Sequence, residues 1–267
     1  MNTTTRVQIM NCEAVRVLTL DDVESRNSLS EELARELLGA LASAATDPSV
    51  RSVLLTGRGK AFCAGGNLKQ FTHADEPLDR YVGRVIRELY TPLALAMHRF
   101  KKPLIAAVNG AAVGAGVGLA LCADVVLAAS SAYFVLPFVP VLGAVPDMGT
   151  SWLVPRLFGQ PRAVGLLLTG ERLSADDAHA AGLIWKALPD TELESAALTL
   201  AESLGALPMD ALQRTKLALA AARHNSFEEQ LELERELQMA SFGSDEFREG
   251  LAAWREDRRP NFRSRWR

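Results

Sequence analysis

Apolar residues near the start of the chain form two short runs, at residues 14–20 and 50–56, and both runs predict β-strands. Between them, leucines recur at helical spacing. Ser28 and Glu31 have the spacing of a capping box, which predicts where this helix begins, and the Asp-Pro pair at 47–48 predicts where it ends. Strand, helix and strand in this order predict a βαβ unit.

The same alternation continues toward the middle of the chain. A glycine-rich segment at 57–67 follows the second strand, and residues 82–97 carry apolar side chains along one helical face. The apolar run 104–108 predicts a third strand, a second glycine-rich segment covers 109–118, and 124–128 predicts a fourth strand. Continuous apolar runs of this kind are typical of parallel strands that are buried on both faces.

The pattern becomes helical after residue 150, and only residues 183–188 interrupt it with a strand-like run. Residues 192–256 have helical spacing throughout. We therefore predict an α/β protein whose C-terminal third is helical.

Composition and charge narrow the function classes. The 267 residues include 29 Lys and Arg against 32 Asp and Glu, a net charge of −3, which argues against a nucleic-acid partner. The most apolar stretch, 103–131, contains Asn109 and Asp124, so we interpret it as buried core and expect no membrane partner. Three cysteines without CxxC spacing, histidines without ligand spacing and no secretory signal predict a cytoplasmic protein without a metal site.

The two glycine-rich segments do not match nucleotide-binding motifs. Gly114, Gly116 and Gly118 give GxGxG rather than GxGxxG, and neither a P-loop nor a GxSxG motif is present in the sequence. Small residues in such loops let backbone N–H groups approach a ligand closely. Two N–H groups aimed at one point would form an oxyanion hole, which stabilises the enolate of a thioester. The alternative is that both segments are close-packed turns without a ligand.

Several segments carry a resemblance that favours the first interpretation. They are LLTGRGKAFCAGGNL at 54–68, KPLIAAVNG at 102–110, GAG at 114–116, AD at 123–124, GAVPD at 143–147, GL at 182–183 and the tail at 250–262. This pattern resembles the enoyl-CoA hydratase/isomerase (crotonase) superfamily over nearly the whole chain.

The resemblance implies an α/β fold in which a crotonase-like spiral of ββα units is followed by a helical C-terminal trimerisation region. Residues 1–195 would form the spiral core and 196–267 the oligomerisation region, which predicts a homotrimer or a dimer of trimers. The implied substrate is an acyl-CoA thioester. No metal or redox cofactor is implied, because coenzyme A enters as part of the substrate.

The resemblance also assigns candidate site residues. The two oxyanion N–H groups carry over to Gly66 and to Ala115, a position that is often glycine in the family. Because the backbone donates, alanine still serves there, although its methyl group narrows the approach. The substrate-binding candidates are Ala64, Gly65, Asn67, Leu68, Gly114, Phe138 and Val139.

The acid–base positions depart from the hydratase pattern. Hydratases use two glutamates, and the matching positions here are Gly118 and either Phe138 or Val139, none of which is a carboxylate. Asp147 instead matches the aspartate of several isomerases of the superfamily, and its segment looks like that of the phenylacetate-pathway ring isomerases. One carboxylate among apolar neighbours, with a raised pKa, suffices for a 1,3-proton shift. The alternative is that Asp147 only caps the helix that begins near Gly149.

We therefore predict an enoyl-CoA isomerase in which Asp147 moves the proton while Gly66 and Ala115 hold the enolate oxygen. One alternative is a hydratase, dehydratase or ring-opening hydrolase with non-standard water activation. Another is a catalytically weak acyl-CoA-binding paralogue, suggested by the missing glutamates. The sequence leaves the acyl group, aliphatic or aromatic, open.

Overall fold

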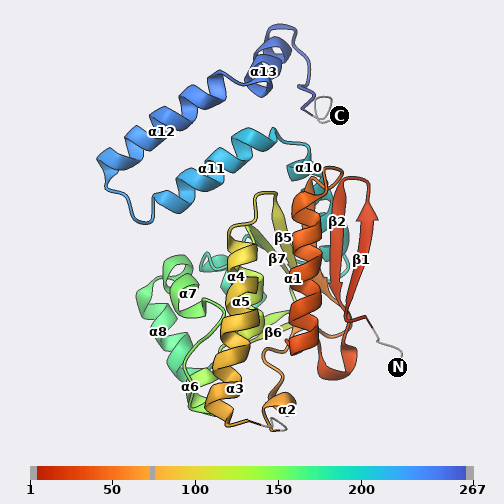
Figure 1. Ribbon diagram of the computed structural model, residues 1–267, viewed down its shortest axis with the longest axis vertical. Helices are drawn as coiled ribbons and strands as arrows, with labels where there is room; N and C mark the ends of the chain where they lie inside the picture. The colour runs from red at the N-terminus through yellow and green to blue at the C-terminus, as the bar shows by residue number, and fades with distance from the viewer. Residues whose placement is uncertain (1–4, 73–75, 263–267) are drawn as a thin grey trace. The chain divides into compact units, whose positions relative to one another are not determined.

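The computed structural model describes residues 5–72 and 76–262, and the chain divides into two compact units between Ala201 and Glu202. The division lies within helix α10 (Leu193–Gly205), a little after residue 195, where the resemblance placed its boundary. The first unit is built on two sheets, and the second contains only helices among its described residues (Figure 1).

The larger sheet of the first unit has six strands in the order β1-β2-β3-β5-β7-β10. All neighbours pair in parallel except β1 and β2, which form an antiparallel hairpin. Every residue of β5 is buried, as a parallel strand covered on both faces should be. The strands are β1 (Val7–Cys12), β2 (Val15–Leu20), β3 (Ser52–Gly57), β5 (Leu104–Val108), β7 (Val125–Ala129) and β10 (Lys186–Leu188).

The smaller sheet carries the glycine-rich segments. Its order is β4-β6-β8-β9, with β4, β6 and β8 parallel and β9 antiparallel. Because β4 follows β3 and β6 follows β5, each pair of strands contributes one strand to each sheet before the next helix. The strands are β4 (Ala61–Cys63), β6 (Ala111–Val113), β8 (Tyr133–Val135) and β9 (Leu173–Ser174).

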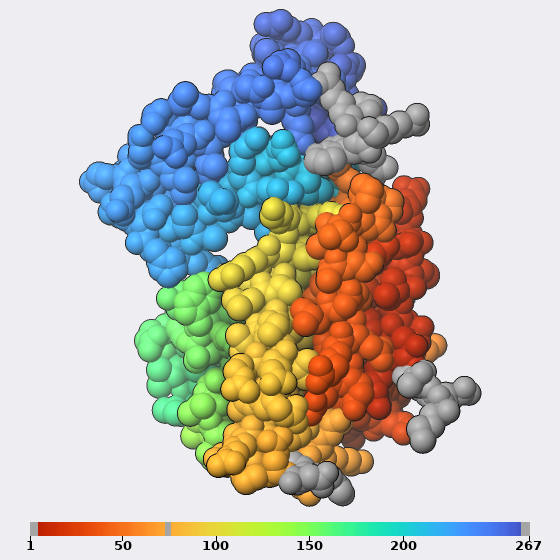
Figure 2. All heavy atoms as spheres, in the orientation of Figure 1, coloured from red at the N-terminus to blue at the C-terminus, as the bar shows by residue number. Residues whose placement is uncertain are grey.

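Helices cover these sheets. Helix α1 lies beside a long helical segment made of α3, the π-helical turn η2 and α4, and the side chains of the two neighbours form one layer, orange and yellow in Figure 2. The helices of the first unit are η1 (Val23–Ser25), α1 (Glu31–Thr46), α2 (Leu68–Phe71), α3 (Leu78–Val85), η2 (Ile86–Tyr90), α4 (Thr91–His98), α5 (Ala115–Leu121), α6 (Phe138–Leu142), α7 (Thr150–Phe158), α8 (Gln160–Thr169), α9 (Ala175–Ala180) and the larger part of α10.

Helix α1 begins two residues later than its predicted cap. Ser30, not Ser28, is the N-cap, and its Oγ accepts a hydrogen bond from the Leu33 N–H at 3.2 Å. The buried Ser28 hydroxyl has no hydrogen-bond partner among the described residues. The capping-box prediction was therefore wrong in register, because two serines precede the helix and Ser30, which has an extended backbone, is the one whose side chain meets the first turn.

The second unit contains only the end of α10, from Glu202 to Gly205, then α11 (Met209–Ala221), α12 (Phe227–Phe242) and α13 (Asp245–Arg255). Helices α11 and α12 pack against each other, and Ser226 with Glu229 forms a complete capping box at the start of α12. Several large apolar side chains of this unit are exposed in the single chain, among them Leu219, Phe227, Met239 and Trp254. Among the described residues, no helix is long and apolar enough to span a membrane.

Candidate active site

The first glycine-rich segment runs from β4 into α2 and is held from outside by the stretch before α1. The Ala64 N–H donates to the Arg26 carbonyl at 3.1 Å, and the Leu29 N–H donates to the Gly65 carbonyl at 2.7 Å. Gly65 has a φ of +86°, and a Cβ there would lie 2.6 Å from the Val113 carbonyl oxygen. Glycine is therefore required at 65 by both conformation and space.

The second glycine-rich segment runs from β6 into α5 and lies against the first. Gly114 has a φ of +52°, and its N–H donates to the Val135 carbonyl. A Cβ on Gly116 would lie 2.2 Å from the Cys63 carbonyl oxygen, so the first turn of α5 packs directly on β4. The Cβ position of Gly65 is 3.5 Å from the Ala115 nitrogen, which places the two loops in contact.

The candidate oxyanion donors, Gly66 and Ala115, have backbone N–H groups that the rest of the site leaves unused. Neither N–H donates a backbone hydrogen bond to any residue within 5–72 or 76–262. Ala115 is 1% exposed and is the first residue of α5, so its N–H is one of the donors that a helix leaves without an internal partner. Two unused N–H groups on touching loops are suited to an anionic oxygen.

Asp147 lies between α6 and α7 with a carboxyl group that is largely buried. Its Oδ1 is buried without a hydrogen-bond partner among the described residues. Burial raises the pKa of Asp147 to about 6, against a smaller lowering effect of its own backbone N–H. An unpaired, partly desolvated carboxylate with such a pKa is suited to accept a proton near neutral pH.

The helix-capping alternative for Asp147 does not describe its side chain. The N-cap of α7 is Gly149, and no side chain caps it. Asp147 contributes only its backbone carbonyl, which accepts hydrogen bonds from the N–H and the Oγ1 of Thr150 at 2.9 and 2.8 Å. The carboxylate is therefore left available for another role.

The charge of Asp147 affects the pKa values of two side chains near the first glycine-rich loop. Its negative charge raises the pKa values of Cys63, at the end of β4, and of Tyr90, although burial is the larger cause for both. The pKa of the fully buried Cys63 is raised to about 12, so the thiol stays neutral. Cys63 is thus a neutral, packed side chain.

Gly118 is the position that the sequence analysis matched to the first glutamate of hydratases, and atoms of Met148 leave no room for a side chain there. A Cβ on Gly118 would lie 2.5 Å from the Met148 Cβ and 2.6 Å from the Met148 carbonyl oxygen. Helix α5 and the residue after Asp147 therefore occupy the space that a longer side chain at 118 would need.

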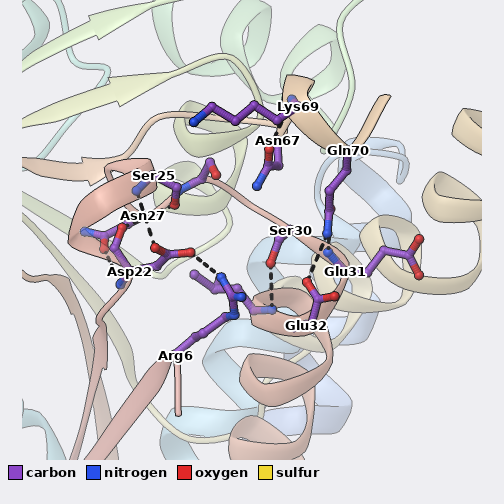
Figure 3. Close-up of polar contacts among 12 residues, drawn as sticks. Arg6, Asp22, Ser25, Asn27, Ser30, Glu31, Glu32, Asn67, Lys69 and Gln70 are labelled. Atoms are coloured by element: carbon purple, nitrogen blue, oxygen red, sulfur yellow. Dashed lines mark hydrogen bonds and ion pairs between the residues drawn. The ribbon is translucent and has the colours of Figure 1, made fainter. Parts of the chain in front are cut away.

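The other substrate-binding candidates lie around the two loops in different ways. The Asn67 side chain accepts a hydrogen bond from the Lys69 N–H and so caps α2 (Figure 3). Leu68 is half exposed. Phe138 is buried, with its ring 3.5 Å from the Cβ position of Gly114, and Val139, next to it on α6, is 41% exposed. Ala64 is half-buried beside Cys63.

The structure adds residues that the sequence analysis did not select. The Cβ position of Gly66 lies 3.5 Å from the Phe71 ring and 3.6 Å from the Tyr90 hydroxyl. Gln70 of α2 donates to the Glu32 carboxylate and accepts from the Glu31 N–H, which anchors α2 on the start of α1 (Figure 3). Tyr90 belongs to no sequence motif, because in the predicted helix over 82–97 it looks like any other apolar position.

Within the described ranges, no group of three or more His, Cys, Asp or Glu side chains is placed to hold a metal ion.

Comparisons with known proteins agree with this fold. A model of the enoyl-CoA hydratase/isomerase family matches residues 11–265. The 1,2-epoxyphenylacetyl-CoA isomerase of Escherichia coli is 40% identical, with 94% of this chain and 95% of that protein aligned. A probable enoyl-CoA hydratase of Rhodobacter capsulatus is 42% identical over 95% of this chain and 96% of its own. A putative enoyl-CoA hydratase/isomerase from Mycobacterium abscessus superposes with a TM-score of 0.91 at 32% identity, covering 97% of this chain and 100% of that one.

Proposed function

The chain belongs to the enoyl-CoA hydratase/isomerase family, and we propose that it isomerises the double bond of an enoyl-CoA thioester through an enolate. The observation that carries the proposal is the carboxyl group of Asp147, which is largely buried, has an unpaired Oδ1 and has a pKa raised to about 6. A single base of this kind suffices, because the group that removes a proton from one carbon can deliver a proton, after exchange with solvent, to the other.

The proposed reaction is a 1,3-proton shift. The Asp147 carboxylate takes the proton from the carbon between the thioester and the alkene, and the electron pair of that C–H bond moves onto the thioester oxygen. The N–H groups of Gly66 and Ala115 stabilise the resulting enolate oxygen. The electrons then return through the conjugated system, and Asp147 delivers its proton to the far end of the former double bond.

The site favours this reaction over hydration by the usual carboxylate pair. Gly118 has no room for a glutamate against Met148, and neither Phe138 nor Val139 supplies the second carboxylate. Water activation would therefore rest on Asp147 alone. The resemblance to an isomerase at 40% identity supports the same choice, while the probable hydratase at 42% identity keeps hydration as the second candidate.

We also propose that the acyl group carries an aromatic or otherwise unsaturated ring. Phe71 and Tyr90 lie within van der Waals distance of the Cβ position of Gly66, and Phe138 lies equally close to that of Gly114. Aromatic side chains beside both oxyanion loops suit a flat apolar acyl group. Substrate and product of a proton shift have the same oxidation level, so the proposed reaction uses no redox cofactor. In this proposal backbone N–H groups polarise the thioester in place of a metal ion, and coenzyme A enters only as part of the substrate.

The test is an NMR assay in D₂O with 3-enoyl-CoA and ring-containing CoA thioesters. We expect the double bond to move with deuterium incorporated at the carbons that lose and gain protons. Addition of water across a 2-enoyl-CoA without migration in any substrate would replace the isomerase proposal with the hydratase. Tight binding of thioesters with no chemical change in any of them would identify an acyl-CoA-binding paralogue.

A further inference from the structure

Tyr90 lies at the end of a π-helical turn, where the helix that covers α1 widens over Ile86–Tyr90. The two residues at the end of this turn, Leu89 and Tyr90, are both 3% exposed. Wide turns of this type occur frequently at functional sites, where they redirect a side chain that a regular helix would place elsewhere. The proton shift proposed above gives the Tyr90 hydroxyl no role.

The Tyr90 hydroxyl donates a hydrogen bond of 2.5 Å to the Leu29 carbonyl. The N–H of the same residue, Leu29, donates to the Gly65 carbonyl at 2.7 Å, and Leu29 forms a parallel bridge with Gly66. One residue thus receives the tyrosine hydroxyl on its carbonyl side and holds the oxyanion loop on its amide side.

The hydrogen bond from the Leu29 N–H also fixes the orientation of the peptide between Gly65 and Gly66. In a trans peptide the carbonyl and the following N–H point in opposite directions. Because the Gly65 carbonyl is directed at Leu29, the Gly66 N–H is directed away from Leu29, where no described residue accepts its hydrogen bond. Any rotation of Leu29 would rotate this peptide and redirect the Gly66 N–H.

We infer that Tyr90 is a positioning residue for the oxyanion hole: through Leu29 it fixes the Gly65–Gly66 peptide so that the Gly66 N–H points at the thioester oxygen. This inference rests on the proposed function of Gly66. Burial, and to a smaller extent the negative charge of Asp147, raises the pKa of Tyr90, so the hydroxyl remains a donor while Asp147 is ionised. The hydroxyl is also only 3.6 Å from the Cβ position of Gly66.

The test uses butyryl-CoA labelled with ¹³C at the thioester carbonyl, a saturated probe that cannot isomerise. Infrared difference spectra of the bound probe report how strongly the N–H groups polarise the carbonyl. Tyr90→Phe keeps the ring and removes the hydroxyl. Tyr133→Phe is the matched control, because Tyr133 lies on β8 with its ring under Arg172, and no hydrogen bond of its hydroxyl is present within the described residues.

We expect wild type and Tyr133→Phe to show the same carbonyl shift, and Tyr90→Phe to lose about half of it, since one of two donors is misdirected. In turnover, Tyr90→Phe should lower kcat about tenfold or more with little change in KM, because the contact matters most for the enolate. Incorporation of 3-fluorotyrosine at position 90 keeps a hydroxyl there and should give the wild-type carbonyl shift. This protein provides the test if Tyr90→Phe does not fold.

Two results would overturn the inference. A wild-type carbonyl shift in folded Tyr90→Phe would mean that Tyr90 does not orient the Gly66 N–H, and the proposed function would stand. The same conclusion follows if the fluorotyrosine protein folds without the shift. Absence of any carbonyl polarisation in the wild type would overturn the oxyanion hole itself, and the role of Tyr90 with it.

Discussion

At the scale of single residues, the proposed activity depends on one largely buried carboxyl group, that of Asp147. Asp147 has an Oδ1 without a partner among the described residues, and burial raises the pKa of its carboxyl group to about 6. A base acts only when it is ionised. We therefore expect kcat/KM for proton transfer to fall about tenfold per pH unit below pH 6 and to level off above it. A pH–rate profile checks this, and a flat profile between pH 5 and 7 would contradict it.

The same carboxyl group should make the protein less stable at high pH. The pKa of Asp147 is about 6 in the folded chain and near 3.8 when unfolded, so between these values the folded state binds more protons. Stability therefore falls as pH rises from about 4 to 6, by about 2 kcal/mol in total after allowance for partial exposure. Asp147→Asn removes this loss.

The measurement for this stability effect is urea unfolding at pH 4.5 and pH 8. Asp147→Asn should be more stable than the wild type at pH 8, and the difference should shrink at pH 4.5. Asp176→Asn, on an exposed position of α9, is the control and should change stability by less than about 1 kcal/mol at both values. A destabilised Asp147→Asn at pH 8 would show that the carboxylate has a structural partner.

At the scale of elements, the start of α1 offers a matched pair of serines. Ser30 caps the helix, whereas the buried Ser28 hydroxyl has no partner among the described residues. Ser30→Ala should reduce the free energy of unfolding by about 1 kcal/mol. Ser28→Ala should leave it unchanged or raise it slightly, because it removes an unpaired buried hydroxyl. Urea unfolding separates the two, and equal losses would contradict the assignment of the cap.

The contact between α5 and the Asp147 segment gives a second test at this scale. Gly118→Ala would place a methyl group 2.5 Å from the Met148 Cβ, so we expect a loss of about 1–3 kcal/mol in stability and a lower kcat. Gly165→Ala, in an open position of α8, is the control and should stabilise the protein by about 0.5–1 kcal/mol. A neutral Gly118→Ala variant would mean that α5 does not fix the Asp147 segment.

Most elements were predictable because their patterns are strong. The run 104–108 is β5 to the residue, and the Asp-Pro pair ends α1, as predicted. Strand β1 (Val7–Cys12) was not predicted: four of its six residues are exposed, so its pattern does not distinguish it from a loop, and only pairing with β2 defines it. Short strands β4 and β6 were likewise hidden inside segments that glycines mark as loops.

The candidate site was predictable to the extent that motifs carry it. The glycine-rich segments and Asp147 are visible in the sequence, and the structure brings the two loops into contact. Tyr90 and Leu29 were not predictable, because their roles depend on hydrogen bonds between residues far apart in the chain. Apolar periodicity assigns both to the core and contains no information about which carbonyl a buried hydroxyl meets.

At the scale of the whole molecule, the exposed apolar residues of the second unit predict self-association. Leu219, Phe227 and Trp254 are each more than 60% exposed in the single chain, which is unusual for a soluble monomer. We expect sedimentation velocity to give a trimer or a dimer of trimers at micromolar concentration. A monomer at all concentrations would contradict the predicted trimerisation region.

The central claim, that Asp147 moves the proton, is tested most directly by deuterium exchange. The measurement is NMR of a ring-containing or 3-enoyl-CoA thioester in D₂O with wild type, Asp147→Asn and the surface control Asp176→Asn. The account predicts exchange and double-bond migration in the wild type and the control, and loss of both by about a hundredfold or more in Asp147→Asn. Exchange and migration at wild-type rates in Asp147→Asn would contradict the account and assign the proton transfer to another group.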